Sequence, residues 1–282
     1  MRQYLIKLLV FITSIGLITW ILVTQNASQP MWALFTSVLV NIISSPLYFG
    51  IIEGLYSLKQ LGLFWKTKVL YRNKDVRLSI SYLFRIKIKG KYLLVKNRKY
   101  DYYQLVGGAY KTLPGVKKVF DKYKVKPDRR FHTDNGVAKN DLRFSLPGKN
   151  VISIIKWFHS REDRETSQWR EFCEELLTPG ILDKHIFRYI DYSYSTTLQT
   201  PIKKAKRLDC QEILIYEIFD LVPNNEQLEA LEKMCDDGDT TLIKWADPLL
   251  IEKLGFDERT KEVEYEIGAH TKWAIFEKWT DD

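Results

Sequence analysis

Three glutamates in the second half of the chain have the residue type and spacing of a cation site. Glu171, Glu174 and Glu175 stand at i, i+3 and i+4, so in a helix their carboxylates share one face. Clustered carboxylate oxygens suit Mg²⁺ that also contacts a phosphate-bearing substrate. The alternative is a solvated acidic face. The other side of the same helix carries an apolar stripe that predicts packing against a core: Trp169, Phe172, Cys173 and Leu176.

The spacing around these glutamates resembles the latter part of the Nudix box, E-x7-R-E-U-x-E-E. Glu162 is followed, after seven residues, by the run 170–175, which reads Arg-Glu-Phe-Cys-Glu-Glu. Two features depart from the family pattern. Lys156 stands where a glycine is expected, and residues 176–179 precede Gly180. A box that is split by an insertion accounts for the first departure.

The opening of such a box lies upstream. The run 91–98 and the segment 103–108, which ends in Gly107-Gly108, look like the strand, turn and Gly-Gly lead-in of a Nudix domain. The resemblance implies that Glu171, Glu174 and Glu175 hold Mg²⁺, with Glu174 and Glu175 as the catalytic residues if the protein is a hydrolase. It also implies that Arg170 orients one of the ligating glutamates.

Basic residues near the two halves of the box are candidates for contact with phosphate groups. The stretch 117–130 holds seven basic and two acidic residues, interleaved with apolar ones. It fits the mouth of a phosphate-binding pocket, and it equally fits a solvated basic face. The candidate ligand-binding residues are Lys96, Arg98, Lys117 and Lys118.

The pattern of the soluble part predicts an α+β domain over 76–282. Alternation over 76–88 and the apolar run 213–219 predict core strands, and 241–245 leads into a short helix. An insertion over 109–160 carries two further expected strands, at 142–146 and 151–155. The resemblance implies a Nudix-like α/β/α sandwich with a mixed sheet.

The N-terminal region has the composition of a membrane hairpin. No charged residue occurs between Leu8 and Ile52, and the runs 4–24 and 31–52 are each long enough to cross a bilayer. We therefore predict a transmembrane helical hairpin over 1–54, followed by an interfacial linker over 55–75. A cleavable signal peptide is the alternative for the first run. Asn41 is a candidate for hydrogen bonding between copies of the second span.

Charge and cysteine usage indicate where such a chain would act. Lysines and arginines flank the hairpin but are absent from its turn, which predicts two spans with both termini in the cytoplasm. The net charge is +8. The three cysteines have no metal-ligand or disulfide spacing and indicate a reducing compartment: Cys173, Cys210 and Cys235.

The combination of a two-span hairpin and a split Nudix box resembles the transmembrane Nudix effectors of bacterial CBASS antiphage defence, the SMODS-associated Nudix group. The resemblance implies a domain that senses a cyclic di- or trinucleotide. It also implies a homo-oligomer that disrupts the lipid bilayer of the bacterial inner membrane and causes cell death. No duplex nucleic acid is expected as a partner. The competing hypothesis is a membrane-anchored, Mg²⁺-dependent Nudix hydrolase of a nucleoside diphosphate derivative. A structural membrane scaffold ranks third, because it leaves the box unexplained.

Overall fold

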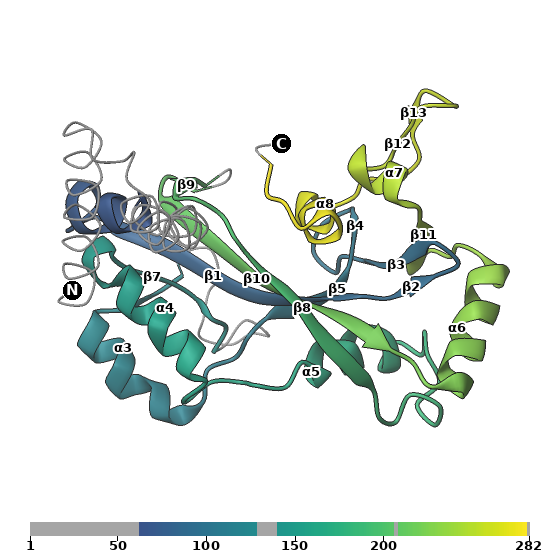
Figure 1. The fold of residues 1–282 in the computed structure, drawn as a ribbon, viewed down its shortest axis with the longest axis horizontal. Helices are drawn as coiled ribbons and strands as arrows, with labels where there is room; N and C mark the ends of the chain where they lie inside the picture. The colour runs from purple at the N-terminus through teal and green to yellow at the C-terminus, as the bar shows by residue number, and fades with distance from the viewer. Residues whose placement is uncertain (1–61, 129–139, 206–207, 281–282) are drawn as a thin grey trace, which may run out of the picture. The chain divides into compact units, whose positions relative to one another are not determined.

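The computed structural model describes residues 62–128, 140–205 and 208–280. The chain divides into two units, Met1–Trp65 and Lys66–Asp282, and every helix and strand with a label in Figure 1 belongs to the second unit. The predicted domain boundaries, at 1–54, 55–75 and 76–282, remain predictions.

The second unit is built on two long parallel strands, β1 (Asp75–Arg85) and β10 (Gln211–Val222). They pair from Val76 opposite Gln211 through Arg85 opposite Asp220. β7 (Arg143–Pro147) and β5 (Val106–Ala109) pair antiparallel with β1, and β8 (Asp191–Gln199) pairs antiparallel with β10. The sheet is completed by β6 (Lys126–Pro127) on β7 and β9 (Lys203–Lys204) on β10. The expected mixed sheet is therefore present.

A second, smaller sheet has the order β11-β3-β2, with β4 paired to β3. Its strands, with a separate two-stranded ribbon, have these bounds: β2 (Lys87–Ile88), β3 (Lys91–Lys96), β4 (Tyr103–Gln104), β11 (Ile243–Ala246), β12 (Phe256–Asp257) and β13 (Glu262–Val263). The helices labelled in Figure 1 are α3 (Lys117–Tyr123), α4 (Val151–Ser160), α5 (Trp169–Phe172), α6 (Asn225–Asp237), α7 (Pro248–Glu252) and α8 (Ala269–Phe276).

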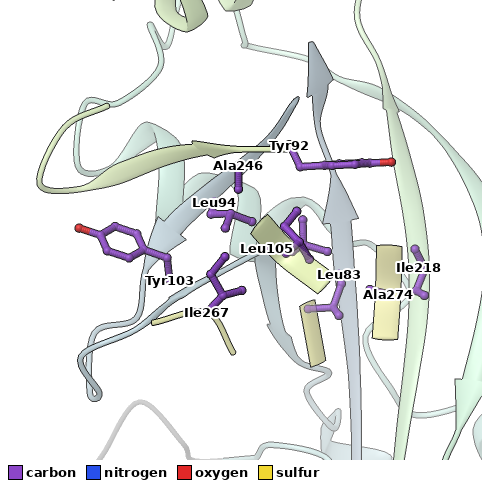
Figure 2. Close-up of a cluster of buried hydrophobic side chains, with 10 residues drawn as sticks. Leu83, Tyr92, Leu94, Tyr103, Leu105, Ile218, Ala246, Ile267 and Ala274 are labelled. Atoms are coloured by element: carbon purple, nitrogen blue, oxygen red, sulfur yellow. The ribbon is translucent and has the colours of Figure 1, made fainter. Parts of the chain in front are cut away.

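The two faces of the long strands are covered by different helices, α3, α4 and α5 on one side and α8 on the other (Figure 1). Leu83 and Ile218 point to the α8 side, where Ala274 joins the buried cluster of Figure 2. Phe84 points the opposite way and contacts Phe172 of α5. Because successive side chains of a strand point to opposite faces, each long strand supports both layers. This explains why residues 76–84 of β1 are buried without interruption.

One predicted strand of the insertion is wrong. Residues 151–155 begin helix α4, whereas the strand expected at 142–146 is confirmed as β7. The buried residues of α4 recur at helical spacing: Val151, Ile154, Trp157 and Phe158. The run is rich in β-branched residues, which favoured a strand, but its contacts with the core select the helix.

The membrane part of the predicted fold class and the predicted localisation are corrected. In the ranges 62–128, 140–205 and 208–280, none of the helices has the length and apolar character needed to cross a bilayer. The run on which the hairpin was predicted, with Asn41 in it, lies outside the described residues. What the structure shows is a mixed α/β domain.

Candidate functional site

The glutamate-bearing segment is helical and lies against β1. We call residues 169–177 the box helix; it consists of α5 and a π-helical turn over Cys173–Leu177. Phe172 is fully buried, with its ring centroid 5.9 Å from that of Phe84 and 5.7 Å from that of Trp169. The apolar stripe therefore anchors the helix to the sheet, as its spacing predicts.

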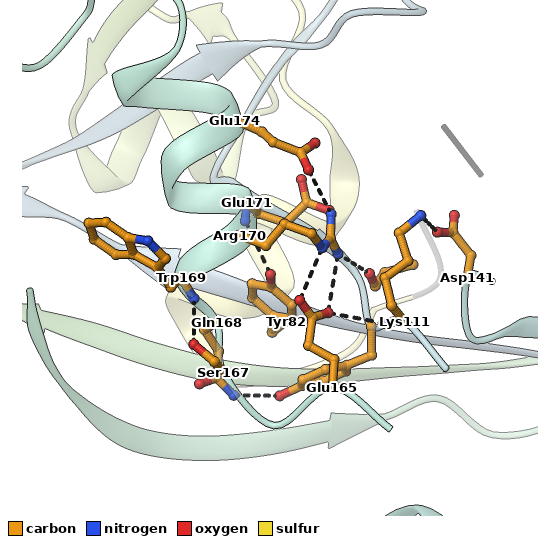
Figure 3. A network of polar contacts seen from close by, with 12 residues as sticks. Tyr82, Lys111, Asp141, Glu165, Ser167, Gln168, Trp169, Arg170, Glu171 and Glu174 are labelled. Carbon is orange, nitrogen blue, oxygen red and sulfur yellow. Dashed lines mark hydrogen bonds and ion pairs between the residues drawn. The ribbon is translucent and has the colours of Figure 1, made fainter. Parts of the chain in front are cut away.

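Arg170 lies at the centre of a network of carboxylates beside this helix (Figure 3). Its Nε is 3.0 Å from Glu165 Oε1, and its Nη1 is 2.5 Å from Glu171 Oε1 and 3.4 Å from Glu174 Oε1. Its Nη2 donates to the carbonyl oxygen of Ala109 in β5 at 2.7 Å. The guanidinium thus joins the two halves of the split box.

Gly107 and Gly108 let β5 approach both β1 and the box helix. Gly107 has φ +151°, and a Cβ there would lie 2.1 Å from the carbonyl oxygen of Tyr82. A Cβ at Gly108 would lie 2.1 Å from Glu171 Oε1. The Gly107 amide donates to Glu175 Oε2 at 2.9 Å. The Gly-Gly pair is therefore a steric requirement of the contact between strand and helix.

Burial changes the proton affinity of two of the three glutamates. Desolvation raises the pKa of Glu175 to about 8, against the opposing effect of the Gly107 hydrogen bond. Desolvation also raises the pKa of Glu171, with Arg170 acting in the opposite direction. Uncompensated burial disfavours the charged form of a carboxyl group. Near neutral pH Glu175 therefore retains a proton in much of the population, and its carboxyl group is a weaker cation ligand than an ionised one.

The three glutamates have the right chemistry for Mg²⁺ but are not gathered around one point. Glu171 and Glu174 face Arg170, whereas Glu175 faces the amide of Gly107. Within the described ranges, histidine, cysteine and acidic side chains form no group of three or more that could hold a metal ion. The structure therefore shows no metal site among the described residues, and the assignment of Glu171, Glu174 and Glu175 as metal ligands stays a prediction.

The candidate phosphate-contacting residues fall in different places. Arg98 reaches the box helix, where it donates to the Glu174 carbonyl oxygen and lies 3.8 Å from Glu174 Oε2. Lys96 pairs with Asp101 at 3.1 Å. Lys117 and Lys118 are exposed at the start of α3. That helix packs through Phe120 against Phe144 of β7 and Trp157 of α4.

Two parts of the site are not evident from the box motif. Glu165, rather than Glu162, pairs with Arg170, and Glu162 is exposed. The second part is a buried chain of hydrogen bonds. Gln168 donates to the Tyr110 hydroxyl at 2.9 Å, and that hydroxyl donates to Glu217 of β10. In the sequence, the only sign of the role of Glu165 is its position five residues before Arg170.

A split box whose helix lies on a mixed sheet defines a Nudix-like domain. The family model for the SMODS-associated NUDIX domain matches residues 75–275, which is more than half of the chain. The protein therefore belongs to the SMODS-associated NUDIX domain family. None of the curated proteins compared with the chain matches it. Mg²⁺, which Nudix domains generally use, is compatible with this membership.

Proposed function

We propose that the protein is an effector of CBASS antiphage defence whose Nudix-like domain binds a cyclic di- or trinucleotide as a signal. Membership of the SMODS-associated NUDIX family supports the link to defence. We also propose that the protein acts as a homo-oligomer. Membrane disruption is not part of the proposal, because it depends on the corrected hairpin.

The observation that favours binding over hydrolysis is the arrangement of the three glutamates. Glu171 and Glu174 face the guanidinium of Arg170, whereas Glu175 faces the amide of Gly107. A hydrolytic centre of the Nudix type needs the carboxylates of the box for its cation. Breaking such partly buried ion pairs costs free energy, because it leaves charges without partners.

The direct test is calorimetry of the full chain against a panel of cyclic di- and trinucleotides. We expect saturable binding of at least one of them, with the nucleotide recovered intact after prolonged incubation with Mg²⁺. The same measurement with linear dinucleotides of the same bases is the control for recognition of the ring. If no cyclic nucleotide binds, the sensor function is rejected.

The second candidate is a Mg²⁺-dependent hydrolase of a nucleoside diphosphate derivative. It is favoured by the three glutamates, which the box helix presents from one segment. On this hypothesis Glu174→Gln and Glu175→Gln each abolish turnover. Robust wild-type hydrolysis that both variants lose would place the hydrolase ahead of the sensor. We expect little or no turnover by the wild-type protein.

A further inference from the structure

A cavity of about 500 Å³ lies at the amino-terminal ends of β1 and β10, away from the box helix. Its lining includes Arg77 of β1, Lys126 of β6, Ser145 of β7 and Lys204 of β9. Arg77 is five residues before Tyr82, whose hydroxyl accepts a hydrogen bond from the box helix. The two side chains point to opposite faces of β1 and are separated by roughly 17 Å along the strand. The cavity is therefore distinct from the Nudix-like site.

The floor of the cavity is a buried ionic group. Arg77 is 3% exposed and lies 2.8 Å from Asp128 and 3.0 Å from Glu212. Asp128 is likewise 3% exposed. The carboxylates of Asp128 and Glu212 place oxygen acceptors beside the guanidinium. This floor can accept hydrogen bonds from donor groups of a ligand, such as the amino groups of a nucleobase.

The rim carries lysine–aspartate pairs, and both aspartates, Asp75 and Asp209, also line the cavity. Lys126 pairs with Asp75 at 2.7 Å and Lys204 pairs with Asp209 at 3.5 Å, while Lys74 contributes a further amine to the lining. The lysine side chains of the two pairs are 56% and 73% exposed. Ion pairs as exposed as these contribute little to stability, so their lysines can turn to a phosphate at small cost.

The size and mixed lining of the cavity match a small organic anion. Pockets for small molecules span roughly 300–1,000 Å³ and combine apolar surface with a few polar groups. Tyr71, Pro127 and Leu208 provide apolar surface, while Ser145 and Gln211 provide hydrogen-bonding groups. A nucleotide has the same division, with a flat base at one end and charged phosphate at the other.

We propose that this cavity binds a nucleotide, with the base toward the Arg77 group and the phosphate at the rim lysines Lys126 and Lys204. The proposal rests on the proposed function in one respect: it makes the cavity the place where the sensed cyclic oligonucleotide is held. The cyclic oligonucleotide would then bind at the amino-terminal end of β1 instead of at the box helix.

The test compares the full-length wild-type protein with the double variant Lys126→Gln/Lys204→Gln, using the panel of cyclic nucleotides and AMP as probes. Each lost lysine–phosphate contact is expected to weaken binding about tenfold or more. Lys253→Gln is the matched control, because Lys253 is also an exposed lysine, 3.3 Å from Glu258 and remote in sequence from the cavity lining. It should bind within about twofold of the wild type.

The outcomes separate the cavity from the wider function. If a cyclic nucleotide binds the wild type and the double variant equally, the cavity proposal is rejected while the sensor function stands. Loss of that binding in Arg98→Gln alone would place the ligand at the box helix instead. If no cyclic nucleotide binds, the sensor function is rejected, and the AMP measurement then tests the cavity proposal by itself. Saturable AMP binding that the double variant weakens supports the cavity proposal. If AMP does not bind, the cavity proposal is rejected.

Discussion

Arg170 determines the electrostatic state of the box helix at the level of single residues. Its planar guanidinium donates in several directions at once, which a lysine amine does with less geometric control. It contacts two acidic side chains that are largely buried, Glu165 at 14% and Glu171 at 13% exposure. The network is therefore a structural requirement of this helix as well as a feature of its chemistry.

Arg170→Ala should lower the free energy of unfolding by roughly 2–3 kcal/mol, because it leaves partly buried carboxylates without their donor. Urea denaturation at pH 7 measures the change. Arg259→Ala is the matched control: this arginine also pairs with an aspartate, Asp257 at 3.2 Å, but its side chain is 86% exposed. Its removal should leave stability almost unchanged. Equal effects of the two substitutions would show that the network contributes nothing specific.

Glu175 should give the protein a measurable pH dependence. Burial raises its pKa from 4.5 to about 8, so between these values the folded state holds a proton that the unfolded state has lost. The free energy of unfolding therefore falls as pH rises through this window, by at most about 1.4 kcal/mol per pH unit from this group. Glu175→Gln keeps an acceptor for the Gly107 amide and should remove that part of the slope.

The measurement is urea denaturation of both proteins from pH 5 to pH 8. The difference between the two curves is the relevant quantity, because groups remote from Glu175 titrate alike in both proteins and cancel. The variant should gain stability relative to the wild type as pH rises. Parallel curves would mean that Glu175 is not held in a desolvated site.

The contact of β5 with β1 is the critical feature at the level of elements. Gly107→Ala places a methyl group against the backbone of Tyr82 and also strains the backbone at φ +151°. Gly180→Ala is a matched control, since Gly180 has φ +76° with open space around its Cβ position. We expect the control to cost roughly 1–2 kcal/mol and Gly107→Ala to cost a further 1–3 kcal/mol. Thermal unfolding of both variants checks this order, and equal losses would contradict the close approach.

The sequence predicts these elements only where a local pattern carries the information. The apolar run 213–219 identifies β10, and the i, i+3 and i+4 glutamates identify the box helix. Residues 151–155 lack a local pattern that identifies their structure. Their β-branched side chains suit a strand, and only packing of Val151 and Ile154 against the core selects α4. Element identity at that point depends on tertiary contacts.

The contacts within the site are harder to predict from the sequence than the box motif is. Glu165 reaches Arg170 because the chain turns sharply before it, with Arg161 at φ +63° and Asp163 at φ +52°. Neither residue is a glycine, so the sequence gives no clear sign of left-handed backbone there. The cavity is similarly hidden, since Arg77, Asp128 and Glu212 come from distant segments that only the sheet brings together.

At the level of the whole domain, β1 and β10 connect the two candidate sites. β1 carries Arg77 at the cavity and Tyr82 beneath the box helix, and β10 carries Glu212 and Glu217 at the corresponding positions. The two strands are parallel partners over this whole length. The two candidate sites are therefore built on the same pair of hydrogen-bonded strands.

The proposed nucleotide site leads to a prediction about the ligand-dependent stability of the whole protein. A nucleotide that binds only the folded state, at 100 times its dissociation constant, stabilises that state by about 2.7 kcal/mol. For a domain of this size the corresponding rise in melting temperature is roughly 5–11 °C.

Because the rim lysines are exposed, the rise should shrink when NaCl is increased from about 0.05 to 0.5 M, where screening shortens the range of charge interactions. Thermal unfolding with and without the nucleotide at each salt concentration measures this, and the ligand-free melting temperature corrects for the effect of salt on the protein itself. A rise that salt leaves unchanged would show that the phosphate is bound by buried groups instead of the rim.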